Sequence, residues 1–437
     1  MTTFLFTLGF IFLALLGTPL FMIIGGVAFV CFYFSGIDPS AVIVEMYRIA
    51  SAPTLLTIPL FTFAGYIMAE SGTPKRLIDV AKACVGWIPG GVAIVTLLNC
   101  AFFTAFTGAS GVTIIAMGGL LYPILISEKY SEKFSLGIVT TCGSLGLLFP
   151  PSLPLILYGL VAQVSIDQLF MAGILPGILL ILLLSLYSMH QGISFQVPRS
   201  SFHFKELGRA LWVAKWEIPL PLLILVGIYG GYFTATEAAA VTAFYVLIVE
   251  GIIYRDISFT KDLPRIIRES MILVGSILII LGSALGFTNY LIDEQVPMKI
   301  LDLMKVYITS KVMFLLVLNI FLIIVGCMMD IFSAIIVVVP LIVPVAKAFD
   351  VHPLHLGMIF LTNLEIGYLT PPVGINLFIS SMRFRKPILS LYNVTIPFLL
   401  ILLLALLIIT YVPYLSTYLV HLFELNSVSA PGLNTAL

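Results

Sequence analysis

Two stretches of this sequence place a Pro-Pro pair among glycine and hydroxyl residues. One reads SLGLLFPPSLP (Ser144–Pro154) and the other reads EIGYLTPPVGI (Glu365–Ile375). Both lie in apolar sequence, and irregular backbone at membrane depth is stable only inside protein or beside a water-filled cavity. Because proline suits the first turn of a helix, each pair predicts a half-helix whose N-terminus points toward the membrane midplane. Such helix ends attract anionic groups, and the unwound carbonyls beside them can bind a cation.

Two further interruptions are predicted at the tips of helical hairpins. Residues 83–127 are uncharged over a length too great for one crossing, and they break at Gly108–Gly111. Residues 311–347 break in the same way at Met329–Ser333. Small residues at such tips let two backbones approach closely. Hydroxyl oxygens for a polar lining are available from Ser110, Thr113, Ser333 and Thr370.

Two acidic residues stand alone in apolar segments. Asp330 is the only charged residue between positions 311 and 347, and Glu365 is the only one between positions 350 and 383. An ionisable group at membrane depth costs at least ~2.5 kcal/mol and therefore indicates a functional site. Asp330 is interpreted as a sodium ligand, with a structural helix cap as the alternative. For Glu365, binding of a cation, binding of a proton and hydrogen bonding to the broken helix all stay open.

The amino-acid composition indicates that these residues lie in a membrane protein. Only 10% of the 437 residues are charged, against about 25% in soluble domains, and 60% are hydrophobic. This excludes a water-soluble enzyme, and equal numbers of basic and acidic residues (21 each) exclude a nucleic-acid-binding protein. Uncharged stretches such as 1–37, 83–127 and 387–423 exceed the ~20 residues that a spanning helix needs. We therefore predict an all-α polytopic membrane protein that is not an enzyme.

The chain is predicted to contain two copies of one unit. Superimposing the two Pro-Pro pairs gives an offset of 221 residues (371 − 150), which also aligns Pro123 with Pro344. The segment TPKRLIDVAK at 73–82 likewise resembles VPMKILDLMK at 296–305. We expect repeats at 1–195 and 217–420, a linker at 196–216 and a tail at 421–437.

Each repeat is predicted to hold scaffold helices, an amphipathic arm at the membrane interface, a re-entrant hairpin, a Pro-Pro-broken helix and a closing helix. The scaffold helices of the first repeat are expected at 3–16 and 19–35, followed by one full crossing at 52–71. The hairpins are placed at 90–127 and 311–347, and the broken helices at 134–163 and 353–382. Segment TATEAAA (234–240) is expected to begin a helix, with Glu237 as the acid of a capping box.

Five crossings per repeat require the two repeats to be inverted relative to each other. With that topology, 16 of the 21 Lys and Arg residues lie on one side of the membrane. The other side holds only five: Arg48, Lys299, Lys305, Lys311 and Lys347. The side rich in basic residues faces the cytoplasm by the positive-inside rule, so both termini are predicted to be periplasmic. Inverted repeats with discontinuous helices at the midplane are typical of secondary transporters.

At these residues the chain resembles a known family. The segments FTGASGVTI, GLLFPPSLP, TATEAAAV and NLEIGYLTPPVGINLF are similar to the large membrane (M, DctM-like) subunit of tripartite ATP-independent periplasmic (TRAP) transporters. The resemblance implies sodium-driven import of an organic acid anion, such as sialic acid or a dicarboxylate, across the bacterial inner membrane by an elevator mechanism. It also implies two partners, a small four-helix membrane subunit and a periplasmic substrate-binding protein.

The resemblance further implies about two Na+ sites, one at the first tip and first break and one at Asp330 and the second break. The predicted sodium ligands are Gly108, Ser110, Gly143, Gly146, Phe149, Pro150, Asp330, Ser333, Glu365, Gly367, Thr370 and Gly374. The predicted substrate-binding residues are Ser110, Gly111, Thr113, Pro151, Ser152, Ser333, Pro372 and Asn376. A self-sufficient sodium- or proton-coupled carboxylate transporter of similar hairpin fold is the alternative, and a channel or structural subunit is the other rival.

Overall fold

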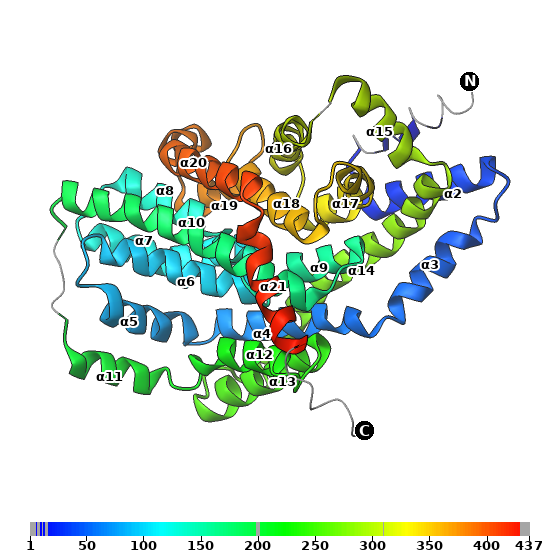
Figure 1. Cartoon of the computed structure of the whole chain (residues 1–437). Helices are drawn as coiled ribbons and strands as arrows, with labels where there is room; N and C mark the ends of the chain where they lie inside the picture. Colours follow the sequence, from blue (N-terminus) through cyan, green and yellow to red (C-terminus); the bar gives the residue numbers. More distant parts are fainter. Residues whose placement is uncertain are drawn as a thin grey trace.

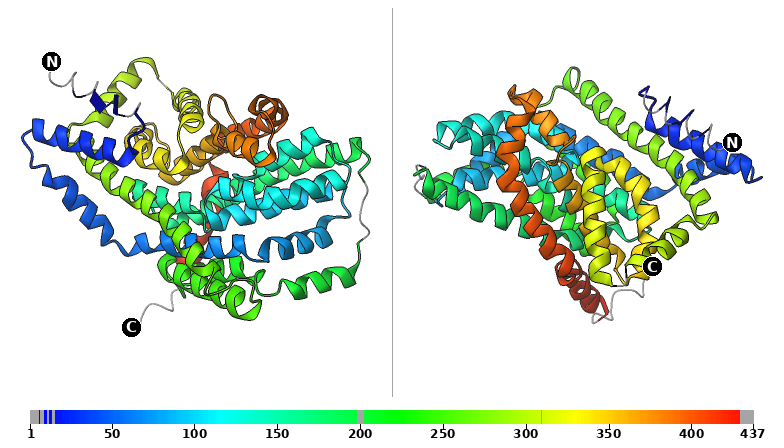
Figure 2. Two further views of the ribbon diagram at one scale, coloured as in Figure 1. Left: turned by 180° about the vertical axis from the view of Figure 1, so that it is seen from behind. Right: turned by 90° about the horizontal axis from the view of Figure 1, so that it is seen from above.

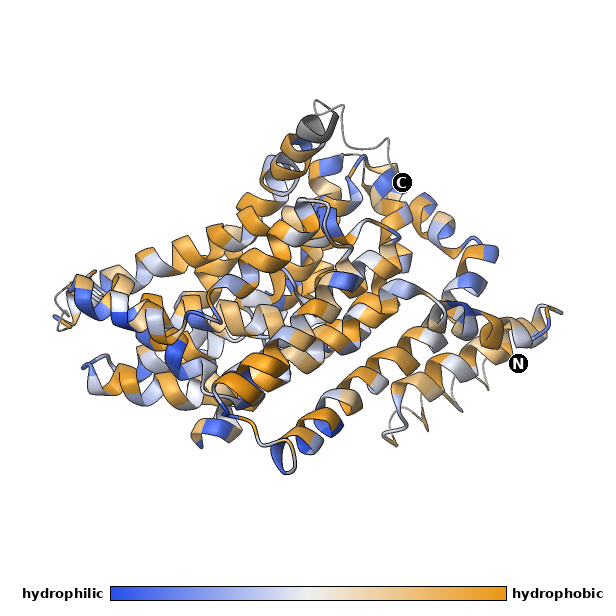
Figure 3. Ribbon diagram, turned by 90° about the horizontal axis from the view of Figure 1, so that it is seen from below, coloured by the Kyte–Doolittle hydropathy of each residue, from blue (hydrophilic) through white to orange (hydrophobic). Residues whose placement is uncertain are grey.

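The computed structural model describes residues 6, 9–10, 12–13, 16–197, 202–308 and 310–428. This part of the chain is helical and contains no strand, which confirms the all-α prediction. Seven of its helices are long and apolar enough to cross a membrane, or up to nine if each bent pair forms one span. Hydrophobic residues run along these helices, and hydrophilic residues gather toward helix ends and loops (Figure 3). The chain is thus a multi-pass membrane protein.

The first half of the chain contains ten described α or 3₁₀ elements and one long closing helix. They are α2 (Leu20–Phe34), α3 (Ser40–Ala50), η1 (Pro53–Leu56), α4 (Thr57–Glu70), α5 (Thr73–Val85), α6 (Gly91–Thr107), α7 (Ser110–Ser127), α8 (Glu132–Cys142), η2 (Leu145–Leu148), α9 (Leu153–Ala162) and α10 (Ile166–Ser194).

The second half follows a short amphipathic helix, α11 (Phe204–Val213), in the predicted linker. Its elements are α12 (Pro219–Tyr229), α13 (Ala235–Ile248), the π-helical segment η3 (Val249–Ile253), α14 (Asp262–Asp293), α15 (Val296–Tyr307), α16 (Lys311–Met328), α17 (Ile331–Ala348), α18 (Pro353–Gly367), α19 (Ile375–Phe384), α20 (Ile388–Tyr411) and α21 (Tyr414–Val428).

The order of elements is similar in the two halves. In each, a helix (α4 or α14) leads to an amphipathic arm (α5 or α15), a helical hairpin (α6–α7 or α16–α17), a helix interrupted at Pro-Pro and a long helix (α10 or α20). Helix ends therefore lie at the predicted tips and on both sides of each Pro-Pro pair, while the re-entrant path of the hairpins stays a prediction. Whether the halves are inverted in a membrane stays a prediction, as do the five crossings per repeat.

Two local features differ between prediction and structure. The single crossing expected at 52–71 is preceded by α3, which the sequence analysis did not predict, whereas α14 is one continuous helix. Pro53 explains the interruption between α3 and α4, because a residue before proline is held out of the helical region and Ala52 has ψ 122°. The boundary predicted at 420 falls inside α21. Most of the helix expected at 3–16, together with positions 198–201, 309 and 429–437, lies outside the described residues.

The two halves interlock around the hairpins. Helix α7 of the first hairpin packs against α19, and α17 of the second hairpin packs against α9. Helix α6 also lies beside α7, α8 and α10 (Figure 1), while α16 runs along α18. One hydrophobic core cluster contains residues of both halves. The hairpins and broken helices therefore form a single packed body, which the two views in Figure 2 show from behind and from above.

A second group of helices packs on the outside of this body. Helix α14 lies against α2, α3 and α4, and α4 lies against α13. Helix α13 begins with the predicted capping box: the Thr234 N–H donates to Glu237 Oε2 at 2.8 Å, and the Glu237 N–H donates to Thr234 Oγ1 at 3.3 Å. The structural interpretation of Glu237 is confirmed.

Candidate ion and substrate site

The tip of the first hairpin is tied to the first break by a threonine. Helix α6 ends at Gly108, which has φ +64°, a conformation that favours glycine, and its N–H bonds to the Thr104 carbonyl at 2.8 Å. The Thr104 hydroxyl donates to the Gly143 carbonyl at 2.8 Å and lies 2.9 Å from Thr113 Oγ1. The tip and the break that the sequence placed in one site are therefore in contact.

Close backbone packing explains two glycines of this break. A Cβ on Gly146 would overlap the Ala101 carbonyl oxygen of α6, and a Cβ on Gly143 would overlap the side chain of Ile114 in α7. Residues at both positions must therefore be small, whether or not their carbonyls bind an ion. Gly111, at the start of α7, faces Ile379 of α19 in the same way, since a Cβ there would lie 2.7 Å from Ile379 Cδ1.

The tip of the second hairpin contains Asp330 as the N-cap of α17. Its Oδ1 accepts hydrogen bonds from the N–H groups of Phe332 (3.0 Å) and Ser333 (3.1 Å). Its Oδ2 accepts a 2.5 Å hydrogen bond from the Ser333 hydroxyl. The capping role that the sequence left as an alternative is thus present in the structure. It does not exclude ion binding, because a carboxylate can accept more hydrogen bonds than these or contact a cation as well.

The second tip rests on the second break. The Ile331 N–H, in the first turn of α17, donates to the Tyr368 hydroxyl at 2.5 Å, and the Gly374 N–H donates to the Cys327 carbonyl at 3.3 Å. A Cβ on Gly367 would overlap the backbone of Gly326, so α16 and α18 touch at this point without side chains between them. Each hairpin tip therefore contacts its own Pro-Pro break.

The two breaks differ in exposure. Pro151 and Ser152 of the first break are buried, whereas Pro371 and Pro372 of the second are exposed. Thr370 beside them is half-buried, and its hydroxyl donates to the Ile366 carbonyl at 2.8 Å. Phe149 and Pro150 are half-buried. Of the predicted substrate-binding side chains, six are buried in this conformation: Ser110, Thr113, Pro151, Ser152, Ser333 and Asn376.

Glu365 and Asn376 lie beside Ser144 of the first break. Glu365, on α18, is completely buried, and the Ser144 hydroxyl lies beside its carboxylate without completing a hydrogen bond. Asn376, on α19, directs its Nδ2 toward Ser144 Oγ (3.4 Å) and the Thr140 carbonyl (3.5 Å). The structure thus places Glu365 beside Ser144 of the first break.

Sequence analysis did not identify Thr104, Ser144 or Tyr368 as site residues. Thr104 lies four positions before the first tip, and the other two lie inside the Pro-Pro segments. A search for hydroxyl groups within one helical turn of each break would have found all three.

Outside the hairpins, Arg76 on α5 is the centre of an ionic cluster. It pairs with Glu217, with Glu250 at 2.7 Å and with Asp256 at 2.7 Å, and its guanidinium stacks on the Tyr254 ring. Burial opposes the charge of Arg76, but the three carboxylates outweigh it and raise its pKa above the ordinary value. Burial likewise opposes ionisation of Asp256, yet the hydrogen bond from Arg76 holds the pKa of Asp256 below its usual value. The cluster fastens the first arm to the second half of the chain.

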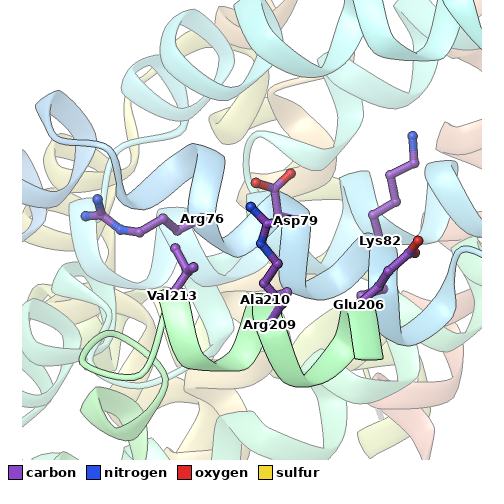
Figure 4. A pocket seen from close by; sticks show the side chains of 8 residues that line it. Arg76, Asp79, Lys82, Glu206, Arg209, Ala210 and Val213 are labelled. Atoms are coloured by element: carbon purple, nitrogen blue, oxygen red, sulfur yellow. The ribbon is translucent and has the colours of Figure 1, made fainter. Parts of the chain in front are cut away.

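A charged pocket of about 380 Å³ lies beside this cluster, between α5 and α11. Arg76, Asp79 and Lys82 line it from α5, and Glu206 and Arg209 line it from α11 (Figure 4). No tip or break contributes to its lining. In the described part of the chain no three His, Cys, Asp or Glu side chains gather as a metal site, so ligands for a cation at the tips would be mainly carbonyl and hydroxyl oxygens.

Comparison with known proteins gives concordant results. Residues 7–415 match the family model described as "Tripartite ATP-independent periplasmic transporter, DctM component". The C4-dicarboxylate TRAP transporter large permease protein DctM of Pseudomonas aeruginosa is 38% identical over 376 residues, which cover 85% of this chain and 87% of that one. The isethionate TRAP transporter permease protein DctMQ of Oleidesulfovibrio alaskensis is 37% identical over 363 residues, covering 82% of this chain and 57% of that one.

Among solved structures, the chain is similar to the crystal structure of the YdaH transporter of Alcanivorax borkumensis. The TM-score is 0.61 with 14% identity, and the match covers 90% of this chain and 88% of that one. At this identity the likeness concerns the fold alone.

Proposed function

Because this chain belongs to the DctM component family of tripartite ATP-independent periplasmic transporters, we propose that it couples import of an organic acid anion to Na+ across the bacterial inner membrane. The two relatives above are named for a C4-dicarboxylate and for isethionate, both small organic anions. This supports an anionic substrate. A dicarboxylate or a sugar acid such as sialic acid fits the predicted half-helix N-termini, which attract anionic groups.

The observation that carries the proposal is the contact of each hairpin tip with its own Pro-Pro break. At the first, the Thr104 hydroxyl reaches the Gly143 carbonyl, and at the second, the Tyr368 hydroxyl reaches the Ile331 N–H. Each contact gathers carbonyl and hydroxyl oxygens, which are suitable ligands for a hard monovalent cation. The second also contains the Asp330 carboxylate. We assign one Na+ to each contact and the anion to the hydroxyl groups between them.

An elevator movement would require two groups of helices that move relative to each other. The interlocked hairpins and broken helices form one body, because α7 packs on α19 and α17 packs on α9. The outer helices α2, α3, α4, α13 and α14 would form the other group, which contacts the body where α4 packs on α6 and α14 packs on α17. The arms α5 and α15 lead from this group into the hairpins. In the proposal the first group moves against the second and carries the substrate and both ions.

Two partners complete the proposed transporter. A periplasmic binding protein would deliver the anion, and a small membrane subunit would accompany the outer helices. The Oleidesulfovibrio alaskensis relative is longer than this chain, which covers 57% of it, and it has the combined name DctMQ. A second membrane component is consistent with that length.

The experiment is uptake into proteoliposomes that contain this chain, its small subunit and its binding protein. A radiolabelled C4-dicarboxylate is the first probe. We expect accumulation with an inward Na+ gradient, none when choline or K+ replaces Na+, and no loss when a protonophore is added. Equal uptake in choline buffer would contradict sodium coupling. Full uptake by the chain alone would favour the self-sufficient carboxylate transporter instead.

A further inference from the structure

Glu365 is a buried acid that the tip sites do not use. Its side chain is completely buried on α18, and neither carboxylate oxygen has a hydrogen-bond partner among the described residues. It is also absent from the ion pairs found in that part of the chain. Removing an ionised carboxylate from water without a partner costs several kcal/mol, so this group requires a positive charge or a proton.

The surroundings of Glu365 contain more acceptors than donors. The Asn376 amide directs its Nδ2 at Ser144 Oγ and at the Thr140 carbonyl, both at long distances of 3.4 and 3.5 Å. The Ser144 hydroxyl in turn donates to the Thr141 carbonyl at 3.4 Å. The Asn376 Oδ1 is buried without a partner, like both oxygens of Glu365. The nearby donors are directed at carbonyls, and one cation among the three unpartnered oxygens would satisfy all of them.

We propose that Glu365, Asn376 and Ser144 bind a Na+ ion of their own, between the two Pro-Pro breaks and distinct from the two tip sites. This inference rests on the proposed sodium-coupled function and extends it. The three residues come from three elements: the end of α18, the first turn of α19 and the residue before η2. A single carboxylate with neutral oxygens balances one positive charge, whereas divalent Ca²⁺ takes 6–8 oxygen ligands, several of them usually carboxylates.

Such an ion would join the two halves of the moving body. Ser144 belongs to the first half and the other two ligands to the second, so the bound ion would hold the first break against α18 and α19. Because Glu365 is completely buried, release of this ion requires the breaks to separate. The site would act as a coupling or structural ion inside the body, and the tips would remain the entry sites.

The experiment counts the Na+ ions bound by the purified full-length chain, using radioactive Na+ at constant ionic strength with choline as the balancing cation. We expect Glu365→Gln to bind one Na+ per chain fewer than wild type. Asp330→Asn should also lose one, and the double variant two. Glu237→Gln is the matched control, because that acid is an exposed helix cap, and its count should equal that of wild type.

If Glu365→Gln does not fold, Asn376→Ala and Ser144→Ala provide the test. Each removes one ligand oxygen but keeps the charge, so one Na+ should bind about tenfold or more weakly. An unchanged sodium titration in Glu365→Gln, or in both alanine variants, overturns the inference and leaves Glu365 as a protonated buried acid. Failure of wild type to bind any Na+ would instead overturn the proposed sodium-coupled function itself.

Discussion

The guanidinium of Arg76 lies 2.7 Å from a carboxylate oxygen of Asp256, 180 positions later in the chain. Arg76 belongs to the arm α5, and Asp256 follows the π-helical end of α13. The same guanidinium contacts Glu217 and Glu250, whose side chains are 2% and 1% exposed. One arginine therefore holds the arm before the first hairpin against three acids of the second half.

We predict that Arg76→Ala destabilises the protein strongly. The change leaves two buried carboxylates without their cation, and breaking a buried ion pair in this way costs about 3 kcal/mol or more. The apparent melting temperature of the purified chain in detergent should fall by several degrees. The matched control is Arg265→Ala, because Arg265 also bonds a carboxylate, Glu70, at 2.8 Å, but both side chains are at least 40% exposed. Equal effects of the two substitutions would show that the Arg76 cluster is not a structural anchor.

Because of Asp256, the stability that this cluster contributes should decrease at acidic pH. Its folded-state pKa is held below the ordinary value of 3.8, so it adds stability that is fully present above pH 3.8 and is lost as the pH falls through the lower folded value. Wild type should therefore melt higher than Asp256→Asn at neutral pH, and the difference should shrink below pH 3.8. The charged or titratable groups facing Asp256 are Arg76 and Glu250, which are the same in both proteins. A difference that grows on acidification would contradict the assignment.

Local sequence signals were sufficient to predict where the helices are interrupted at the breaks and tips. Glycine and Pro-Pro interrupt helices through their own backbone restrictions, so Gly108 and the pair Pro150-Pro151 mark interruptions whatever surrounds them. The same reasoning fixed the capping box at Thr234 and Glu237, which are only three positions apart. Features that depend on residues close in sequence were therefore predictable.

Contacts between distant segments were not predictable from these signals. The partners of Arg76 lie 141, 174 and 180 positions away, and nothing in the periodicity of α5 indicates which acids it meets. The direction of Glu365 is a further example. Its sequence neighbours belong to the second break, but the packing of α18 on the first half places it beside Ser144. Only the tertiary arrangement distinguishes these possibilities.

Gly367 should tolerate no side chain. A Cβ there would overlap the backbone of Gly326, so Gly367→Ala must push α16 away from α18 and move the second tip off its break. Overpacking of this kind costs roughly 1–3 kcal/mol. We expect weaker uptake and a higher Na+ concentration for half-maximal uptake. Gly275→Ala is the control, since a Cβ on that exposed helical glycine meets nothing within 4 Å. If Gly367→Ala kept the sodium dependence of wild type, the α16–α18 contact would not be needed for ion binding.

The inverted arrangement of the two arms predicts opposite labelling. Lys75 on α5 and Lys299 on α15 are both exposed, and they occupy similar positions in similar sequences. In a cysteine-free background, Lys299→Cys should react with a membrane-impermeant maleimide in intact cells. Lys75→Cys should react only after the membrane is permeabilised. Labelling of both from outside would mean that the repeats are parallel, and the predicted topology would be wrong.

Asp330 permits a separation of its capping and ion-binding roles. The residue caps α17 through the N–H groups of Phe332 and Ser333, and asparagine is nearly as good an N-cap as aspartate. Asp330→Asn should therefore keep the fold while losing the negative charge that attracts Na+. We expect uptake to fall sharply and the Na+ concentration for half-maximal uptake to rise. Asp330→Ala removes the cap as well and should lower stability by a further ~1 kcal/mol. If Asp330→Asn transports with unchanged sodium dependence while Asp330→Ala melts lower, the carboxylate is only a helix cap. The second tip must then bind its ion through hydroxyl and backbone oxygens alone.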